Sequence, residues 1–187
     1  ALLIVFCLVL KHLGRFDAGE KAIQAMAKIV AYALAVSIFF VLVELFTVFY
    51  SGLPEHKAPF VYLFAGLDGH HNLVPWMWTS TVLAFAALAM LIVPAIRRKE
   101  GCLALACIAV FASLWIEKGL GLVITGFIPS PLEAVTEYNP TGPEIAITLG
   151  VWALGFLILT AFYQIFIAVR SAIDGAPDNK ATVELKY

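Results

Sequence analysis

Long apolar runs separated by short polar segments make up most of this chain, and they predict membrane-spanning helices. Four runs, at about 26–50, 73–96, 102–126 and 143–169, are long enough to cross about 30 Å of hydrocarbon at a helical rise of about 1.5 Å per residue. A fifth run, at 1–11, is shorter, and we interpret it as the end of a truncated transmembrane helix. The pattern therefore predicts an all-α fold, a polytopic transmembrane helix bundle with about five transmembrane helices.

The polar segments define the remaining divisions of the chain. We expect a cytoplasmic loop at 12–25 and a four-helix transmembrane bundle over 26–170, with outer loops at 51–72 and 127–142. A cytoplasmic tail is expected at 171–187. The first residues show no starting Met, basic region or small-residue cleavage site, so no signal peptide is indicated, and we expect a larger membrane protein to continue upstream.

The outer loop at 51–72 carries helix breakers around an apolar middle. Pro54, Pro59, Gly66 and Gly69 interrupt it, and the stretch PFVYLFAGL inside it is far too short to span a bilayer. We expect this stretch to lie in the membrane interface or to dip into the membrane and return.

Composition and charge agree with a membrane location. Of the 187 residues, 62% are hydrophobic and 13% are charged, and the mean hydropathy is +0.94, far outside the range of soluble globular domains. The net charge of −1 suggests no nucleic-acid partner. The three cysteines lie in apolar segments without CxxC spacing, so we expect packing residues rather than a disulfide or a metal site.

The positions of basic residues predict the orientation. Of the two sets of alternate loops, one holds nearly all the lysines and arginines and the other holds only Lys57, so the positive-inside rule places the basic loops and the C-terminus in the cytoplasm. The basic set comprises Lys11, Arg15, Lys21, Lys28, Arg97, Arg98, Lys99, Arg170, Lys180 and Lys186.

Three charged residues inside the apolar runs are the main candidates for chemistry. Charge within a hydrocarbon-length helix costs a few kcal/mol, on the order of 3 per residue, so it persists where it is paired or used. Glu44, Glu117 and Lys118 all fall in the outward half of the predicted membrane. They would line a pocket or a proton route there, or one carboxylate would simply pair with Lys118 and lock two helices together. Two acids with one base leave one carboxylate unbalanced, which favours proton or quinone chemistry.

Histidine placement bears on haem and quinone. No spanning run contains a histidine, so we expect no haem in this chain. His70 and His71 precede the run that opens with Trp78. A loop histidine there is suited to a quinone carbonyl or to proton transfer, or else to an interfacial anchor or a partner contact. The first interpretation of Trp78 itself is a member of an interfacial aromatic belt.

The segment after the charged pair is rich in proline. The sequence FIPSPLEAVTEYNPTGPE predicts a restrained extracytoplasmic loop, because proline lowers the entropy lost when a loop becomes ordered against another protein. It is suited to docking a peripheral subunit, with a plain connector as the alternative.

Several of these segments together resemble a known family. The sequences WIEKG, GFIPSPLEAVTEYNPTGPEI and ITLGVWALG, and more loosely HHNLVPWMW, resemble the polysulfide reductase membrane-subunit family, also called NrfD/PsrC-like. The likeness is greatest to its ten-helix type, which contains DsrP and HybB. Five runs are about half of ten, so the resemblance implies the C-terminal half of such a subunit. The family's best-established quinone pocket then belongs to the N-terminal bundle.

The resemblance also implies a function. It implies a multi-pass subunit of the prokaryotic cytoplasmic (inner) membrane, without haem or iron–sulfur cluster of its own, that exchanges electrons between menaquinone or ubiquinone and an extracytoplasmic iron–sulfur (ferredoxin-like) subunit. Cytochrome b or c subunits, the subunit's own N-terminal bundle and lipid are the other implied partners, and proton translocation has been proposed for the family.

We therefore expect a quinone-interacting subunit of a respiratory redox complex. Glu44, Glu117 and Lys118 are the candidates for proton handling, with His71 and Trp78 as candidate quinone contacts.

Two alternatives stay open from the sequence. An ion or small-solute transporter would need helices interrupted at mid-membrane, for which the fourth run offers only Gly119 and Gly121. A purely structural membrane anchor would have its charged pair saturated by neighbours, with no cavity beside it.

Overall fold

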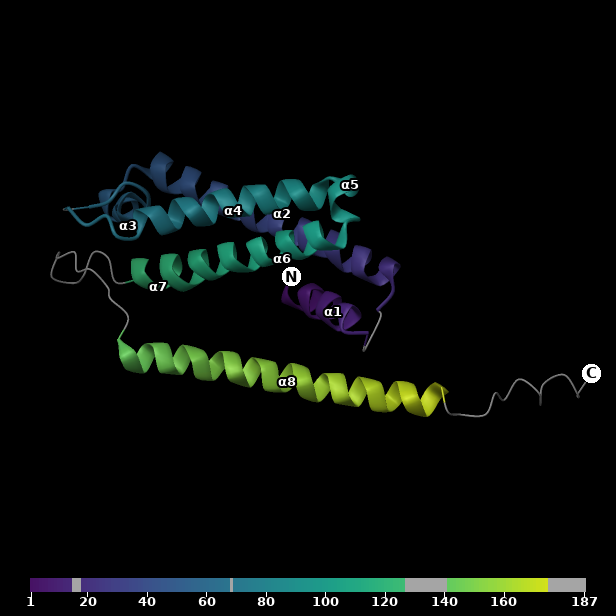
Figure 1. The fold of residues 1–187 in the computed structure, drawn as a ribbon. Coiled ribbons are helices and arrows are strands. Elements are labelled where there is room, and N and C mark those ends of the chain that lie inside the picture. The colour runs from purple at the N-terminus through teal and green to yellow at the C-terminus, as the bar shows by residue number, and fades with distance from the viewer. Residues whose placement is uncertain (15–17, 68, 127–140, 175–187) are drawn as a thin grey trace, which may run out of the picture. The chain divides into compact units, whose positions relative to one another are not determined.

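The computed structural model describes residues 1–14, 18–67, 69–126 and 141–174 (Figure 1). All regular elements among these residues are helices, which confirms the all-α prediction. The chain divides into two units, Ala1–Tyr138 and Asn139–Tyr187, and each is described by itself.

Four stretches of the described helices are long and apolar enough to cross a membrane, so the polytopic helical architecture is as predicted. They are Glu20–Ser51, Val74–Ile92, Glu100–Gly121 and Gly142–Val169.

The first unit opens with α1 (Leu2–His12) and the long helix α2 (Glu20–Ser51). Helix α2 begins inside the segment expected as a loop at 12–25, so that loop is shorter than predicted. The physical reason is local: Glu20 in the first turn complements the helix N-terminus, and Ile23 is already buried in the core.

The outer segment 51–72 contains a short helix, α3 (Pro54–Phe64). Pro54 begins it, as proline favours the first helical position, but Pro59 lies inside it and is therefore not the breaker we predicted. Pro59 has no amide to donate, so a carbonyl in the first turn of α3 lacks its helical donor. That turn is exposed, and water can donate to the carbonyl instead. Gly66, at φ +86°, directly follows the end of the helix at Ala65, and Gly69, at φ +85°, turns the chain further on.

The third apolar run is divided near its end. Helix α4 (Val74–Ile92) stops at Val93, and the four-residue helix α5 (Pro94–Arg97) follows. Pro94 lacks the amide needed to continue α4, and the guanidinium of Arg97 donates to the Leu91 carbonyl at 3.1 Å, which gives a partner to one of the last carbonyls of the helix.

The fourth run is a composite helix that changes its hydrogen-bond pattern. It consists of α6 (Glu100–Trp115), the π-helical turn η1 (Ile116–Gly121) and α7 (Leu122–Thr125). Helices α4 and α6 lie side by side and form the main packing pair of the unit, with α1 against α6 and α2 against α4 (Figure 1).

Small residues allow these helices to approach closely. Ala27 of α2, Ala87 of α4 and Ala106 of α6 are fully or almost fully buried in one core. Such residues are common at packed interfaces of membrane helices, because they let backbones come together. A second, smaller core contains Tyr62, Leu63, Met77 and Ile116.

At one end of the first unit, polar contacts join the segments that carry the basic residues. Lys11 pairs with Glu100, and Gln24 exchanges hydrogen bonds of 3.1 Å with the backbone and side chain of Arg97. The alternation of basic and non-basic ends within this unit is thus as predicted, while the assignment of the basic end to the cytoplasm stays a prediction.

The second unit is described by one helix, α8 (Gly142–Asp174), about 50 Å long at the usual rise. The Thr141 amide donates to Glu144 Oε2 at 2.8 Å, which is the bond from the N-cap amide to the third helical residue in a capping box. This bond explains why the helix starts beside Pro143, as predicted. Most of the proline-rich loop (127–140) and the tail beyond 174 lie outside the described residues. A four-helix bundle over 26–170 stays a prediction.

Candidate functional site

A cavity of about 770 Å³ lies in the first unit between α2, α3, α4 and the composite helix. It exists because α2 packs into the core only through its first half: its buried residues are Ile23, Ala27, Ala31 and Leu34. From Ile38 onward the inward side of α2 lines the cavity instead. A mainly apolar cavity of this size with a few polar groups is typical of a small-molecule site.

The π-helical turn forms one wall of this cavity. The Leu122 amide donates to the Glu117 carbonyl, five residues earlier, which is the π pattern. Such turns are rare, and they occur often at functional sites. Gly119 and Gly121 within the turn make a departure from α geometry less costly.

The π turn also shifts which residues face α4. Along α6 the buried residues recur every three or four positions, and Val110, Ser113 and Ile116 continue that row. In an α-helix the next member would be residue 119 or 120, but the buried position is Gly121. Without a side chain, Gly121 lies against Met77, where an added Cβ would come within 3.2 Å of the Met77 Cε atom.

Glu117 and Lys118 form an ion pair on this turn. Lys118 Nζ lies 2.7 Å from Glu117 Oε1, with side-chain exposures of 53% and 21% respectively, and both residues line the cavity. Neighbouring residues do not face each other on an α-helix, and the wider π turn lowers the angle between them. Because the pair lies within one turn, it does not lock two helices together.

Glu44 reaches the same cavity from α2, so the structure brings together the three residues predicted for proton handling. Their roles in chemistry stay predictions.

The two predicted quinone contacts are placed differently. Trp78 lines the cavity, but its indole N–H donates to the Phe64 carbonyl at 3.1 Å, so only its ring is available to a ligand. The ring also meets Phe64 edge-on at 5.9 Å. His71 lies outside the cavity lining among the described residues, and its imidazole packs over Gly66, where a Cβ atom would overlap it.

Two polar residues at the cavity were missed from the sequence. Glu55 and His56 line it from the first turn of α3. The available signal was Pro54 followed by Glu55, a pattern that favours a helix N-terminus and would have put both side chains on a helix rather than in a loop.

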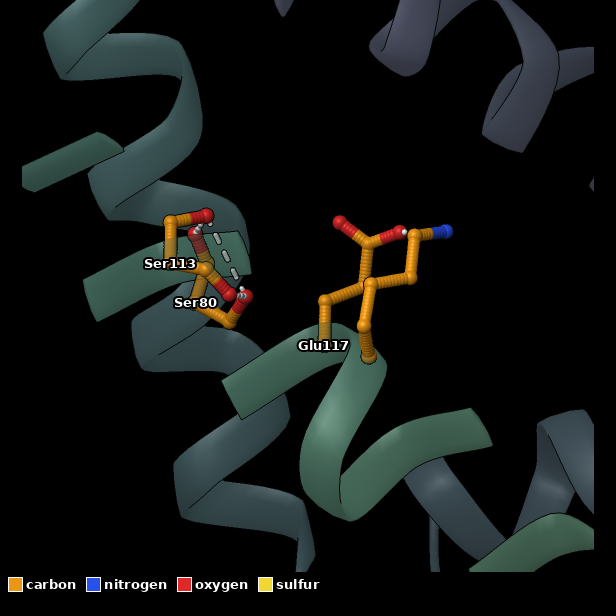
Figure 2. Close-up of polar contacts among 4 residues, drawn as sticks. Ser80, Ser113 and Glu117 are labelled. Atoms are coloured by element: carbon orange, nitrogen blue, oxygen red, sulfur yellow. Dashed lines mark hydrogen bonds and ion pairs between the residues drawn. The ribbon is translucent and has the colours of Figure 1, made fainter. Parts of the chain in front are cut away.

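Two buried serines join α4 to α6, and one of them, Ser80, also lines the cavity (Figure 2). Ser80 Oγ donates to the Ser113 carbonyl and Ser113 Oγ to the Ser80 carbonyl, each at 2.9 Å. Ser80 is 2% exposed and Ser113 is fully buried. The described residues contain no group of three or more histidine, cysteine or acidic side chains placed to hold a metal ion.

Comparison with known proteins finds a similarity to a membrane subunit. The chain is 25% identical, over 199 aligned residues, to a protein of Halobacterium salinarum that is named as a dimethyl sulfoxide reductase membrane subunit. The alignment covers 94% of this chain and 44% of that protein, so the chain spans less than half of its relative's length. No protein-family model and no solved structure matches the sequence.

The similarity supports the coarser part of the resemblance found in the sequence, a likeness to membrane subunits of reductases. The NrfD/PsrC-like family and its DsrP/HybB type stay predictions.

Proposed function

We propose that this chain belongs to a membrane subunit of a redox enzyme complex and that its cavity binds a membrane quinone. The observation that carries the proposal is the position of the Glu117–Lys118 pair, on a π turn, in the wall of an apolar cavity of about 770 Å³. The relative's name, a reductase membrane subunit, supports the redox setting.

The cavity has the chemistry that menaquinone or ubiquinone requires. A quinone combines an apolar ring and isoprenoid tail with two carbonyl oxygens, and its interconversion with the quinol moves two electrons and two protons. The apolar side chains of α2 and α4 suit the ring and tail. Lys118 is placed to donate a hydrogen bond to a quinone oxygen, and the Glu117 or Glu44 carboxylate to accept or return a proton.

The electrons require a partner. By the resemblance described above, an extracytoplasmic iron–sulfur (ferredoxin-like) subunit exchanges them, with cytochrome b or c subunits as further members of the complex. In this proposal the proline-rich loop after α7 is the docking segment for the iron–sulfur subunit, and net proton translocation accompanies turnover.

The decisive test is turnover of the purified complex with Glu117→Gln. Loss of the carboxylate should lower quinone-dependent turnover by about 100-fold, the usual scale for a positioned acid or base. Glu20→Gln, at the exposed start of α2 and away from the cavity, is the matched control and should behave as wild type. Unchanged turnover in both Glu117→Gln and Glu44→Gln would sink the proposal.

The π turn η1 is the observation that bears on a second candidate, an ion or small-solute transporter, because transporters place irregular helices at their binding sites. Ion flux into vesicles containing this subunit without redox partners would identify it. The structural-anchor alternative requires a charged pair with no cavity beside it, and Glu117 and Lys118 have one.

A further inference from the structure

The turn that carries Glu117 and Lys118 is attached to α4 on both sides of the pair. Before the pair, Ser80 Oγ of α4 donates to the Ser113 carbonyl at 2.9 Å. After the pair, Gly121 lies against Met77, also of α4. Met77 and Ser80 are three residues apart and share one helix face, so a single face of α4 contacts the composite helix at both points.

The Ser80 hydroxyl acts on a particular carbonyl. In α-helical register the Ser113 carbonyl is the acceptor for the amide of residue 117. Here it accepts from Ser80 Oγ and also from the Ile116 amide, which donates to both Ala112 and Ser113. A hydroxyl from a neighbouring helix that occupies a carbonyl of this ladder lowers the cost of changing the hydrogen-bond register at that point.

The bond in the other direction, from Ser113 to Ser80, ends in a regular part of a helix. Ser113 Oγ donates to the Ser80 carbonyl, which lies within the regular helix α4. In Figure 2 no hydrogen bond is drawn between the carboxylate of Glu117 and either serine, so we take the influence of Ser80 on it to pass through the backbone. The two hydroxyls lie 3.3 Å apart and donate equal bonds at one interface, but only the bond of Ser80 is made to a carbonyl just before the π turn.

We propose that Ser80 is a positioning residue, whose hydroxyl sets the π turn through the Ser113 carbonyl and so holds the Glu117–Lys118 pair at the cavity wall. A return of the turn to α register would separate the two charged side chains, because adjacent residues on an α-helix do not face each other. The effect on turnover rests on the proposed function, in which the pair acts on a quinone, whereas the effect on the pair itself does not.

The first test needs no quinone. In the detergent-solubilised native complex, the rate at which an N-hydroxysuccinimide ester acylates Lys118 is measured by mass spectrometry, with Lys57 of α3 as internal reference. Glu117→Gln should raise the rate about two- to fivefold, the scale of a partly exposed ion pair. Ser80→Ala should raise it similarly, and Ser113→Ala should leave it near the wild-type rate.

A structural role alone predicts something else. Ser80→Ala and Ser113→Ala each remove one buried hydroxyl from the same interface, so both should lower the melting temperature by similar amounts. Equal acylation rates in the two variants, or a wild-type rate in Ser80→Ala, would overturn the proposal. So would a wild-type rate in Glu117→Gln, because the pair would then not exist to be held.

The second test measures quinone turnover. Displacement of the charged pair should lower kcat of Ser80→Ala by about 10- to 100-fold with little change in KM, since small misplacements of reacting groups are costly. A raised KM with unchanged kcat would mean that Ser80 contacts the quinone directly, and would contradict a positioning role. If Glu117→Gln and Glu44→Gln both keep full turnover, the proposed function fails, and the acylation experiment still decides whether Ser80 sets the turn.

Discussion

At the scale of the residue, Gly66 determines where His71 lies. The chain turns at Gly66 with φ +86°, and the imidazole of His71 occupies the space that any side chain at Gly66 would need. Gly69 has nearly the same backbone conformation, at φ +85°, but open space around it. The two glycines therefore separate the cost of a left-handed backbone, which both share, from the cost of the crowding at Gly66 by the His71 ring and, at 2.9 Å from an added Cβ atom, the His70 carbonyl oxygen.

This difference predicts the stability of two alanine variants. Gly69→Ala should lose about 1 kcal/mol from the left-handed conformation, and Gly66→Ala should lose more, because the His71 ring must also move. Melting of the detergent-solubilised protein measures both. The double variant Gly66→Ala/His71→Ala should recover part of this loss but stay below Gly69→Ala, because the His70 carbonyl oxygen would still lie 2.9 Å from the new Cβ atom. No recovery would show that the ring is not the obstacle.

At the scale of the element, apolar run length predicted the spans but not the changes of hydrogen bonding inside them. The runs gave the helices to within a few residues because burial in hydrocarbon depends on length and composition alone. Hydropathy carries no information on which backbone groups hydrogen-bond within a helix, so it predicted neither the π turn at Ile116 nor the break at Pro94. Glu44 and Glu117 line one cavity, and the topology led us to expect them near each other, whereas the position of His71 depends on a turn that hydropathy does not describe.

The π turn itself can be tested with its two glycines. Gly119→Ala and Gly121→Ala gain the same helix propensity, about 1 kcal/mol, so any difference between them comes from their surroundings. A Cβ at Gly119 meets nothing within 4 Å, whereas one at Gly121 lies 3.2 Å from Met77 Cε. We expect Gly119→Ala to keep wild-type turnover and to be at least as thermally stable as the wild type.

Gly121→Ala should lower quinone turnover several-fold, because Met77 or the turn must shift by a few tenths of an ångström. Equal turnover in the two variants would show that the turn tolerates a looser contact with α4.

At the scale of the whole first unit, the cavity forms because helix α2 separates from the other helices along its second half. Helix α2 leaves the core after Leu34, and α3 covers the opening between α2 and α4. No single element contains the site, so its shape could not be predicted from the pattern of any one run. Adjacent residues of α2 nevertheless have opposite environments: Leu45 lines the cavity, and Phe46 is 67% exposed on the outer surface.

These neighbours give a test of whether the cavity holds the quinone. Leu45→Trp adds volume inside the cavity and should raise KM for a short-chain quinone analogue about tenfold or more, as expected when a ligand pocket loses shape complementarity. It should also lower the yield of photolabelling by an azidoquinone. Phe46→Trp adds the same kind of ring on the outer surface and keeps an aromatic partner for Tyr50, which stacks on Phe46 at 5.6 Å. Its KM and labelling should match wild type. A normal KM in Leu45→Trp, or equal losses in both variants, would place the quinone outside this cavity.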